Sequence, residues 1–123
     1  MTQYLYKTFA FVLLGIVLNF FLCADVFAQQ LPKNPKNSDD YIRIIKYYRY
    51  LNPDSALIYV KQGLKLAEQQ GDDLGKAALL NQHGMIDDNA TRYRESREKY
   101  LEAEAIYREK GDEIGLAATI VRL

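Results

Sequence analysis

The sequence predicts an all-α protein in which antiparallel helix pairs stack on one another. Apolar residues recur with the spacing of an amphipathic helix in every segment after residue 38, and no segment alternates as a half-buried strand would. The stretch "LAEQQGDDLGKAA" at residues 66–78 also returns 40 positions later, as "IYREKGDEIGLAA" at residues 106–118. Self-similarity at a fixed period of this size is typical of proteins that repeat one helix pair.

The expected helices cover residues 39–51, 53–70, 73–86, 92–110 and 113–123. The first should end at Asn52, because a residue before proline is pushed out of the helical conformation. Asn52 then caps the second helix, and Pro53 stands in its first turn, where a missing N–H is harmless. Gly71 is suited to the left-handed residue that ends a helix, and Asp72 to capping the next one. A polar break, "DDNAT", separates the third helix from the fourth, and Gly111–Asp112 repeats the stop and start.

The amino-terminal residues differ in composition from the rest of the chain. An apolar run over residues 9–24 is 16 residues long, shorter than the roughly 20 that a membrane-spanning helix needs. Val26 and Ala28 follow it and place small residues where a signal peptidase reads. We therefore expect a cleavable signal peptide over residues 1–28, export to the periplasm or beyond the cell, and a flexible lead-in over residues 29–38. The alternative is an uncleaved helix that anchors the chain in a membrane.

Charge and side-chain chemistry argue against several classes of function. The 16 Lys and Arg residues balance the 16 Asp and Glu residues, and their interspersion leaves no basic patch for nucleic acid. Cys23, the only cysteine, lies in the segment expected to be removed. His83, the only histidine, has no neighbouring nucleophile and is better suited to packing than to catalysis. Arg92 stands where a calcium loop would need glycine. We expect no enzyme, no cofactor and no metal site.

The stretch "LLNQHGMIDDNATRYRESREKYLEAEAIYREKGDEIG" at residues 79–115 resembles the tetratricopeptide repeat in its longer form. The small and aromatic positions of that pattern are matched by Gly84, Tyr93, Ser96, Ala103 and Tyr107. The sequence departs from the pattern at Asp87, where an aromatic is usual, and near Thr91, where a glycine is usual. The resemblance covers about residues 41–123 and implies a right-handed solenoid of stacked helix pairs. Helical pairs of the HEAT type are the structural alternative.

The resemblance also implies a binding face. Tetratricopeptide proteins bind peptides or protein segments along the concave face that the first helix of each pair forms. The residues carried over to that face are Tyr41, Ile45, Tyr48, Arg49, Asn81, Met85 and Asp88. We expect Asn81 to hydrogen-bond a peptide backbone, and Met85 and Ile45 to give adaptable apolar contact.

The last helical segment, residues 113–123, is apolar where a terminal repeat helix should be polar. We expect either that the chain is a fragment of a longer repeat protein or that this segment pairs with another copy. The leading hypothesis for function is an exported scaffold that binds a protein or peptide. The alternative is a truncated sensory input region of a repeat-containing signalling kinase or transcriptional regulator.

Overall fold

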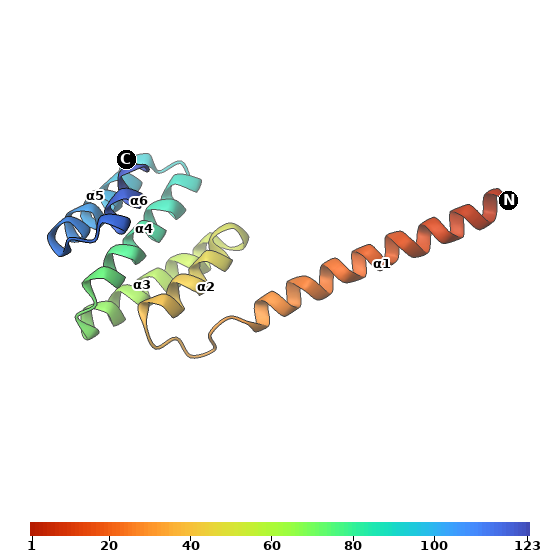
Figure 1. Ribbon diagram of the computed structural model, residues 1–123, viewed down its shortest axis with the longest axis horizontal. Helices are drawn as coiled ribbons and strands as arrows, with labels where there is room; N and C mark the ends of the chain where they lie inside the picture. Colours follow the sequence, from red (N-terminus) through yellow and green to blue (C-terminus); the bar gives the residue numbers. More distant parts are fainter. The chain divides into compact units, whose positions relative to one another are not determined.

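The computed structural model describes residues 1–123, apart from the side chains of residues 20–29. Along the described backbone, the chain forms six helices and no strand (Figure 1). It divides into two units, Met1–Leu31 and Pro32–Leu123, which we describe separately.

The first unit consists of α1, Thr2–Gln29, and the residues around it. The described large apolar side chains of α1, from Tyr4 to Leu18, are exposed. Among the described residues, no helix combines the length and apolar character that crossing a membrane requires. The expectations for Cys23 and for cleavage after Ala28 concern residues 20–29 and lie outside the described side chains.

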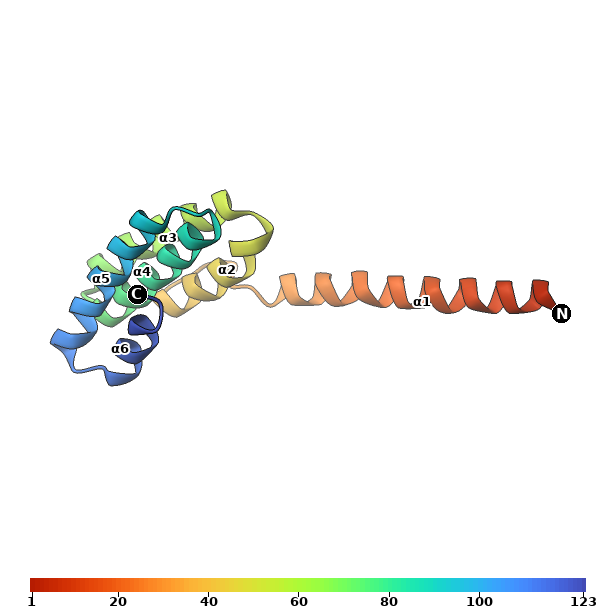
Figure 2. The same cartoon turned by 90° about the horizontal axis from the view of Figure 1, so that it is seen from above.

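The second unit consists of five helices that pack against their neighbours. They are α2 (Ser38–Leu51), α3 (Pro53–Gln70), α4 (Asp73–Asn89), α5 (Tyr93–Lys110) and α6 (Glu113–Ile120). Each helix contacts the next one along the chain, and α4 contacts α2 as well as α3. Figures 1 and 2 both show α4 with α2 and α3 on one side and α5 and α6 on the other. The expectation of an all-helical fold with packed neighbouring helices is confirmed.

Short-range hydrogen bonds set most of the helix ends where the sequence predicts them. The Asn52 side chain accepts from Ser55 N at 3.0 Å, with Pro53 as the first residue of α3. Gly71 and Gly111 end α3 and α5 in the left-handed conformation, with φ of 64° and 69°. Asp72 and Asp112 then accept from the backbone N–H three residues ahead, at 2.9 and 3.0 Å. The repeated sequence therefore forms the same helix junction twice.

Part of the expected lead-in is held in place by hydrogen bonds. Asn37 caps α2 by accepting from Asp40 N at 2.9 Å, so the helix begins at Ser38. The carbonyl of Lys36 accepts from the Gln70 side chain at 2.9 Å, which joins this segment to the end of α3.

The end of α4 lies beyond its expected position at residue 86. The helix continues through the expected polar break to Asn89. Arg92 N donates to Asp87 O, and Thr91 N donates to Asp88 O, both at 2.9 Å, which is the Schellman arrangement that also ends α3 and α5. Here the left-handed residue is Thr91, with φ of 60°, instead of a glycine. At the other end of the unit, α6 stops at Ile120 and does not reach the expected residue 123.

Replacing Thr91 by glycine should stabilise the protein by about 0.5–1 kcal/mol. A β-branched residue in the left-handed region costs about 1–2 kcal/mol, whereas glycine adopts it freely. The greater freedom of glycine in the unfolded chain offsets part of this gain. Urea denaturation would measure the change, with Thr91→Ala as the control that keeps a Cβ. A Gly variant no more stable than the Ala variant would contradict the argument.

The core of the second unit forms two clusters that share α4. Leu79 and Ile86 pack with α2 and α3 residues in one cluster. Ala77 and Leu80 pack with Ala103 and Tyr107 of α5 in the other. Every residue of both clusters lies between Tyr41 and Leu116, within the second unit, Pro32–Leu123. We therefore expect residues 29–123 to fold without α1.

Candidate functional site

A polar pocket lies where the carboxyl-terminal ends of α2 and α4 meet the residues after α6. Its volume is about 180 Å³. We call it the arginine pocket, and it is lined by Arg49, Tyr50, Met85, Asp88, Asn89 and Arg122. Because α2, α4 and α6 are the first helices of successive pairs, the pocket spans the stack and does not belong to one pair.

Arg49 is held in the arginine pocket by uncharged partners. Its Nη1 donates to Gln82 Oε1 at 3.0 Å and lies against the sulfur of Met85, while Nη2 donates to the Tyr50 hydroxyl at 3.1 Å. The guanidinium carbon lies 4.8 Å from the centre of the Tyr50 ring, in a cation–π arrangement. Among the described residues, no carboxylate pairs with Arg49, and its buried Nε has no hydrogen-bond partner. Arg49 is therefore a positioned cation without an anion.

Asp88 joins the pocket to α5. Its carboxylate accepts from the Tyr100 hydroxyl at 2.7 Å and, through its other oxygen, from the hydroxyl of Ser96. Burial, together with the hydrogen bond to Asp88, raises the pKa of Tyr100 to about 12. The carboxylate is thus held by two neutral donors and fixes the packing of α4 on α5.

The pKa of Tyr100 predicts a loss of stability in alkali. An unfolded tyrosine ionises near pH 10, whereas Tyr100 in the fold ionises near 12. The stabilisation is therefore complete below about pH 10 and declines as the pH rises towards about 12. Unfolding in urea from neutral to alkaline pH should show a shallower decline for Tyr100→Phe, with the exposed Tyr93→Phe as the matched control. Equal declines in the two variants would contradict this.

The amino-terminal ends of the same helices form a second pocket, of about 330 Å³. Asp39, Asp72 and Asp112 line it, so its charge is opposite to that of the two arginines. Asp72 and Asp112 serve as helix caps, and Asp72 also accepts from Ser38 at 2.6 Å. Among the described residues, no three His, Cys, Asp or Glu side chains are placed so that they could hold a metal ion.

The seven residues predicted for the binding face do not all lie on it. Arg49, Met85 and Asp88 line the arginine pocket together. The structure corrects the expectation for Ile45, which is 0% exposed in the core between α2 and α3 and has no surface for a partner. It also corrects that for Asn81, which is buried and donates to Thr119 of α6 at 2.8 Å.

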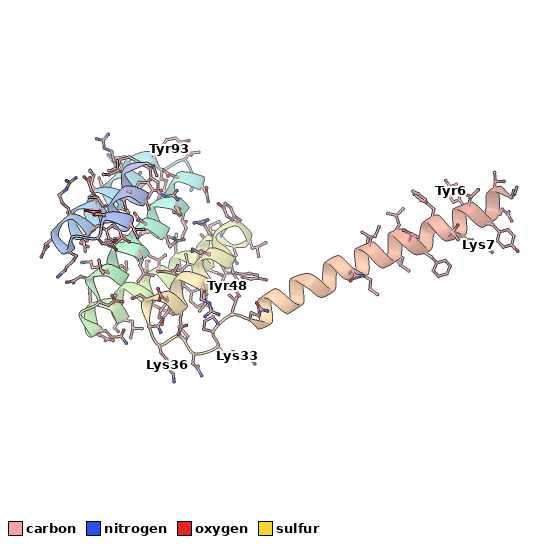
Figure 3. The ribbon with its side chains drawn as sticks, viewed as in Figure 1. Tyr6, Lys7, Lys33, Lys36, Tyr48 and Tyr93 are labelled. Carbon is pink, nitrogen blue, oxygen red and sulfur yellow. The ribbon has the colours of Figure 1, made fainter. Side chains whose placement is uncertain are left out.

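The two predicted tyrosines of α2 face α3. Tyr41 lies against Gly63, and Tyr48, labelled in Figure 3, stacks on Tyr59 with ring centres 5.6 Å apart. The connection between α2 and α3 is a single residue, Asn52, whereas three residues join α4 to α5. Because these connections differ in length, residues 40 positions apart on α2 and α4 do not occupy equivalent faces of their helices.

Sequence reasoning missed Tyr50, Asn89 and Arg122. The 40-residue period offered a signal for one of them, because Arg122 corresponds to Gln82, the partner of Arg49. Comparisons of the chain with family models, with curated proteins and with solved structures found no match.

Proposed function

We propose that this chain is an exported, non-enzymatic scaffold of the tetratricopeptide type that binds an extended peptide segment of a protein partner. In this proposal the stack is a right-handed solenoid, α1 is the signal peptide, and the groove runs along α2, α4 and α6. The observation that carries the proposal is the arginine pocket, which residues from successive first helices build around an unpaired Arg49.

The ligand group that best suits this pocket is a carboxylate. The Arg49 guanidinium is already oriented by Gln82 and Tyr50, so less side-chain freedom is lost when an anion binds. Asn89 and Tyr50 add an amide and a hydroxyl that suit a peptide backbone. Met85 contributes an adaptable apolar wall.

The opposite charges at the two ends of the helices favour one direction of binding. A peptide with an acidic residue at the arginine pocket would place a basic residue near Asp39, Asp72 and Asp112. The reversed peptide would bring like charges together at both ends. We therefore expect ligands with an acidic residue towards one end and a basic residue towards the other.

A random peptide display library, with residues 29–123 as bait, would test this function. We expect enriched peptides to share an acidic position, and Arg49→Ala to weaken their binding about tenfold to a hundredfold, because a charged hydrogen bond contributes about 1.5–3 kcal/mol. The matched control is Arg97→Ala, at an exposed arginine of α5 outside the pocket. The proposal fails if no peptide is enriched, or if both substitutions weaken binding equally.

A further inference from the structure

Two helices of the unit, α4 and α6, begin with the same junction but differ in what covers them. Each follows a left-handed glycine and starts at a capping aspartate. By the 40-residue period, Asp73, Ala77 and Leu80 of α4 correspond to Glu113, Ala117 and Ile120 of α6. We call the three α6 residues the open face.

In α4, the corresponding face is covered by α5. Ala77 is 0% exposed and Leu80 is 3% exposed, and both pack with Ala103 and Tyr107. At the edge of this contact, Lys110 Nζ lies 2.7 Å from Asp73 Oδ2, and the hydrogen bond from Lys110 lowers the pKa of Asp73. A small residue, a tyrosine and a lysine of one helix thus cover the α4 face.

None of the described residues covers the open face of α6 in this way. Ala117 is exposed, and Ile120 is 48% exposed where its α4 counterpart is buried. No described cation forms an ion pair with Glu113. The opposite side of α6, at Thr119, is fully buried against the unit, so the helix is fixed with the open face outward.

We propose that the open face of α6 binds an amphipathic helix of a partner polypeptide, in the way that α5 binds α4. The partner helix presents a small residue, an aromatic residue four positions later and a basic residue three positions after that, the spacing of Ala103, Tyr107 and Lys110. The small residue and the aromatic bury Ala117 and Ile120, and the basic residue meets Glu113. The helix runs antiparallel to α6, as α5 does to α4.

A neighbouring isoleucine provides an internal control for this geometry. Ile114 is more exposed than Ile120, at 85%, but its α4 counterpart Leu74 stays 42% exposed beside α5. Apolar exposure alone therefore favours Ile114 as the contact residue, whereas the correspondence with α4 selects Ile120. The same substitution at these two positions separates the explanations.

The probe for the test is a labelled synthetic peptide with the sequence of residues 92–111, titrated into residues 29–123 and followed by fluorescence anisotropy. We expect saturable binding that Ile120→Glu weakens at least tenfold and Ile114→Glu leaves unchanged. A peptide carrying Lys110→Glu should bind more weakly to the unchanged chain. That peptide should recover on a chain carrying Glu113→Lys, since the swap restores opposite charges. Circular dichroism would confirm that each variant chain is folded.

Three outcomes would overturn the proposal. The first is an absence of peptide binding. The second is binding that Ile120→Glu does not affect, since the peptide would then be replacing α5 on α4. The third is a dimer in light scattering that Ile120→Glu dissociates, since a second copy would then cover the open face. The peptide library above probes the arginine pocket, so either proposal can fail without the other.

Discussion

Gly84→Val is expected to destabilise the protein by about 3 kcal/mol, at the upper end of the usual cost of overfilling a packed core. A Cβ at residue 84 would lie 2.5 Å from Cε1 of Tyr100, well inside van der Waals contact. The tyrosine ring cannot move aside, because Tyr100 is 1% exposed and its hydroxyl is bonded to Asp88 at 2.7 Å. Chemical denaturation of residues 29–123 would measure the loss.

A smaller substitution tests the sign of this effect. Alanine is favoured over glycine within a helix by about 1 kcal/mol, yet Gly84→Ala should still destabilise because of Tyr100. Tyr100→Leu removes the ring that an alanine at residue 84 would meet, but it also removes the hydrogen bond to Asp88. The double variant should therefore lose less stability than the sum of the two single variants. Ala105→Gly, at an exposed position of α5, measures the helix preference alone. A stabilising Gly84→Ala would show that the close approach of α4 and α5 at this point is not required.

Arg92→Ala is the second substitution with a large expected effect. Asp87 is 3% exposed, and its Oδ1 accepts from Arg92 Nε at 3.0 Å and from Nη2 at 2.6 Å. Removing the guanidinium leaves a buried carboxylate without its cation. The expected cost is about 2–3 kcal/mol, below the value for fully buried pairs, because the Arg92 side chain is 43% exposed. The Arg92 side chain makes no capping hydrogen bond to α5, so no cap is lost.

The size of this effect should depend on pH through His83. Its Nε2 lies 3.6 Å from Asp87 Oδ2. Burial holds the pKa of His83 below its usual value, an effect that Asp87 opposes and that three nearby cations, Lys99, Arg92 and Lys61, reinforce. Without Arg92, protonated His83 becomes the remaining partner of Asp87, and the His83 pKa rises. Because a raised histidine pKa adds stability on the acidic side, the loss should be smaller near pH 5.5 than near pH 8.

Two further variants separate the charge from the packing. Asp87→Asn added to Arg92→Ala should recover most of the lost stability, because an uncharged amide costs less to bury than an unpaired carboxylate. His83→Gln should remove the pH dependence. If Arg92→Ala unfolds at the same urea concentration as the unchanged chain, the ion pair with Arg92 does not contribute to the stability of the fold around Asp87.

The sequence predicted the helices because the signals that begin and end them are local. Asn52, Gly71 and Asp72 act on backbone groups within a few residues, so their roles can be deduced without knowledge of the fold. The end of α4 was placed too early because the polar stretch "DDNAT" was interpreted as a break, whereas the helix continues to Asn89 and ends at Thr91 in the left-handed conformation. A hydrogen bond across the same turn joins the side chains of Arg92 and Asp87.

The sequence by itself determined that the chain is helical, where most helices start, and that one junction occurs twice. Only the tertiary structure decided which faces are buried, because burial depends on which helices surround a given one. Both sides of α4 are covered, so Leu79 and Ala77 are buried on different faces of the helix. A single apolar stripe, as expected for an amphipathic helix, could not describe both faces. The same packing put Ile45 in the core and left Arg49 in a pocket, although the two residues are four positions apart on α2.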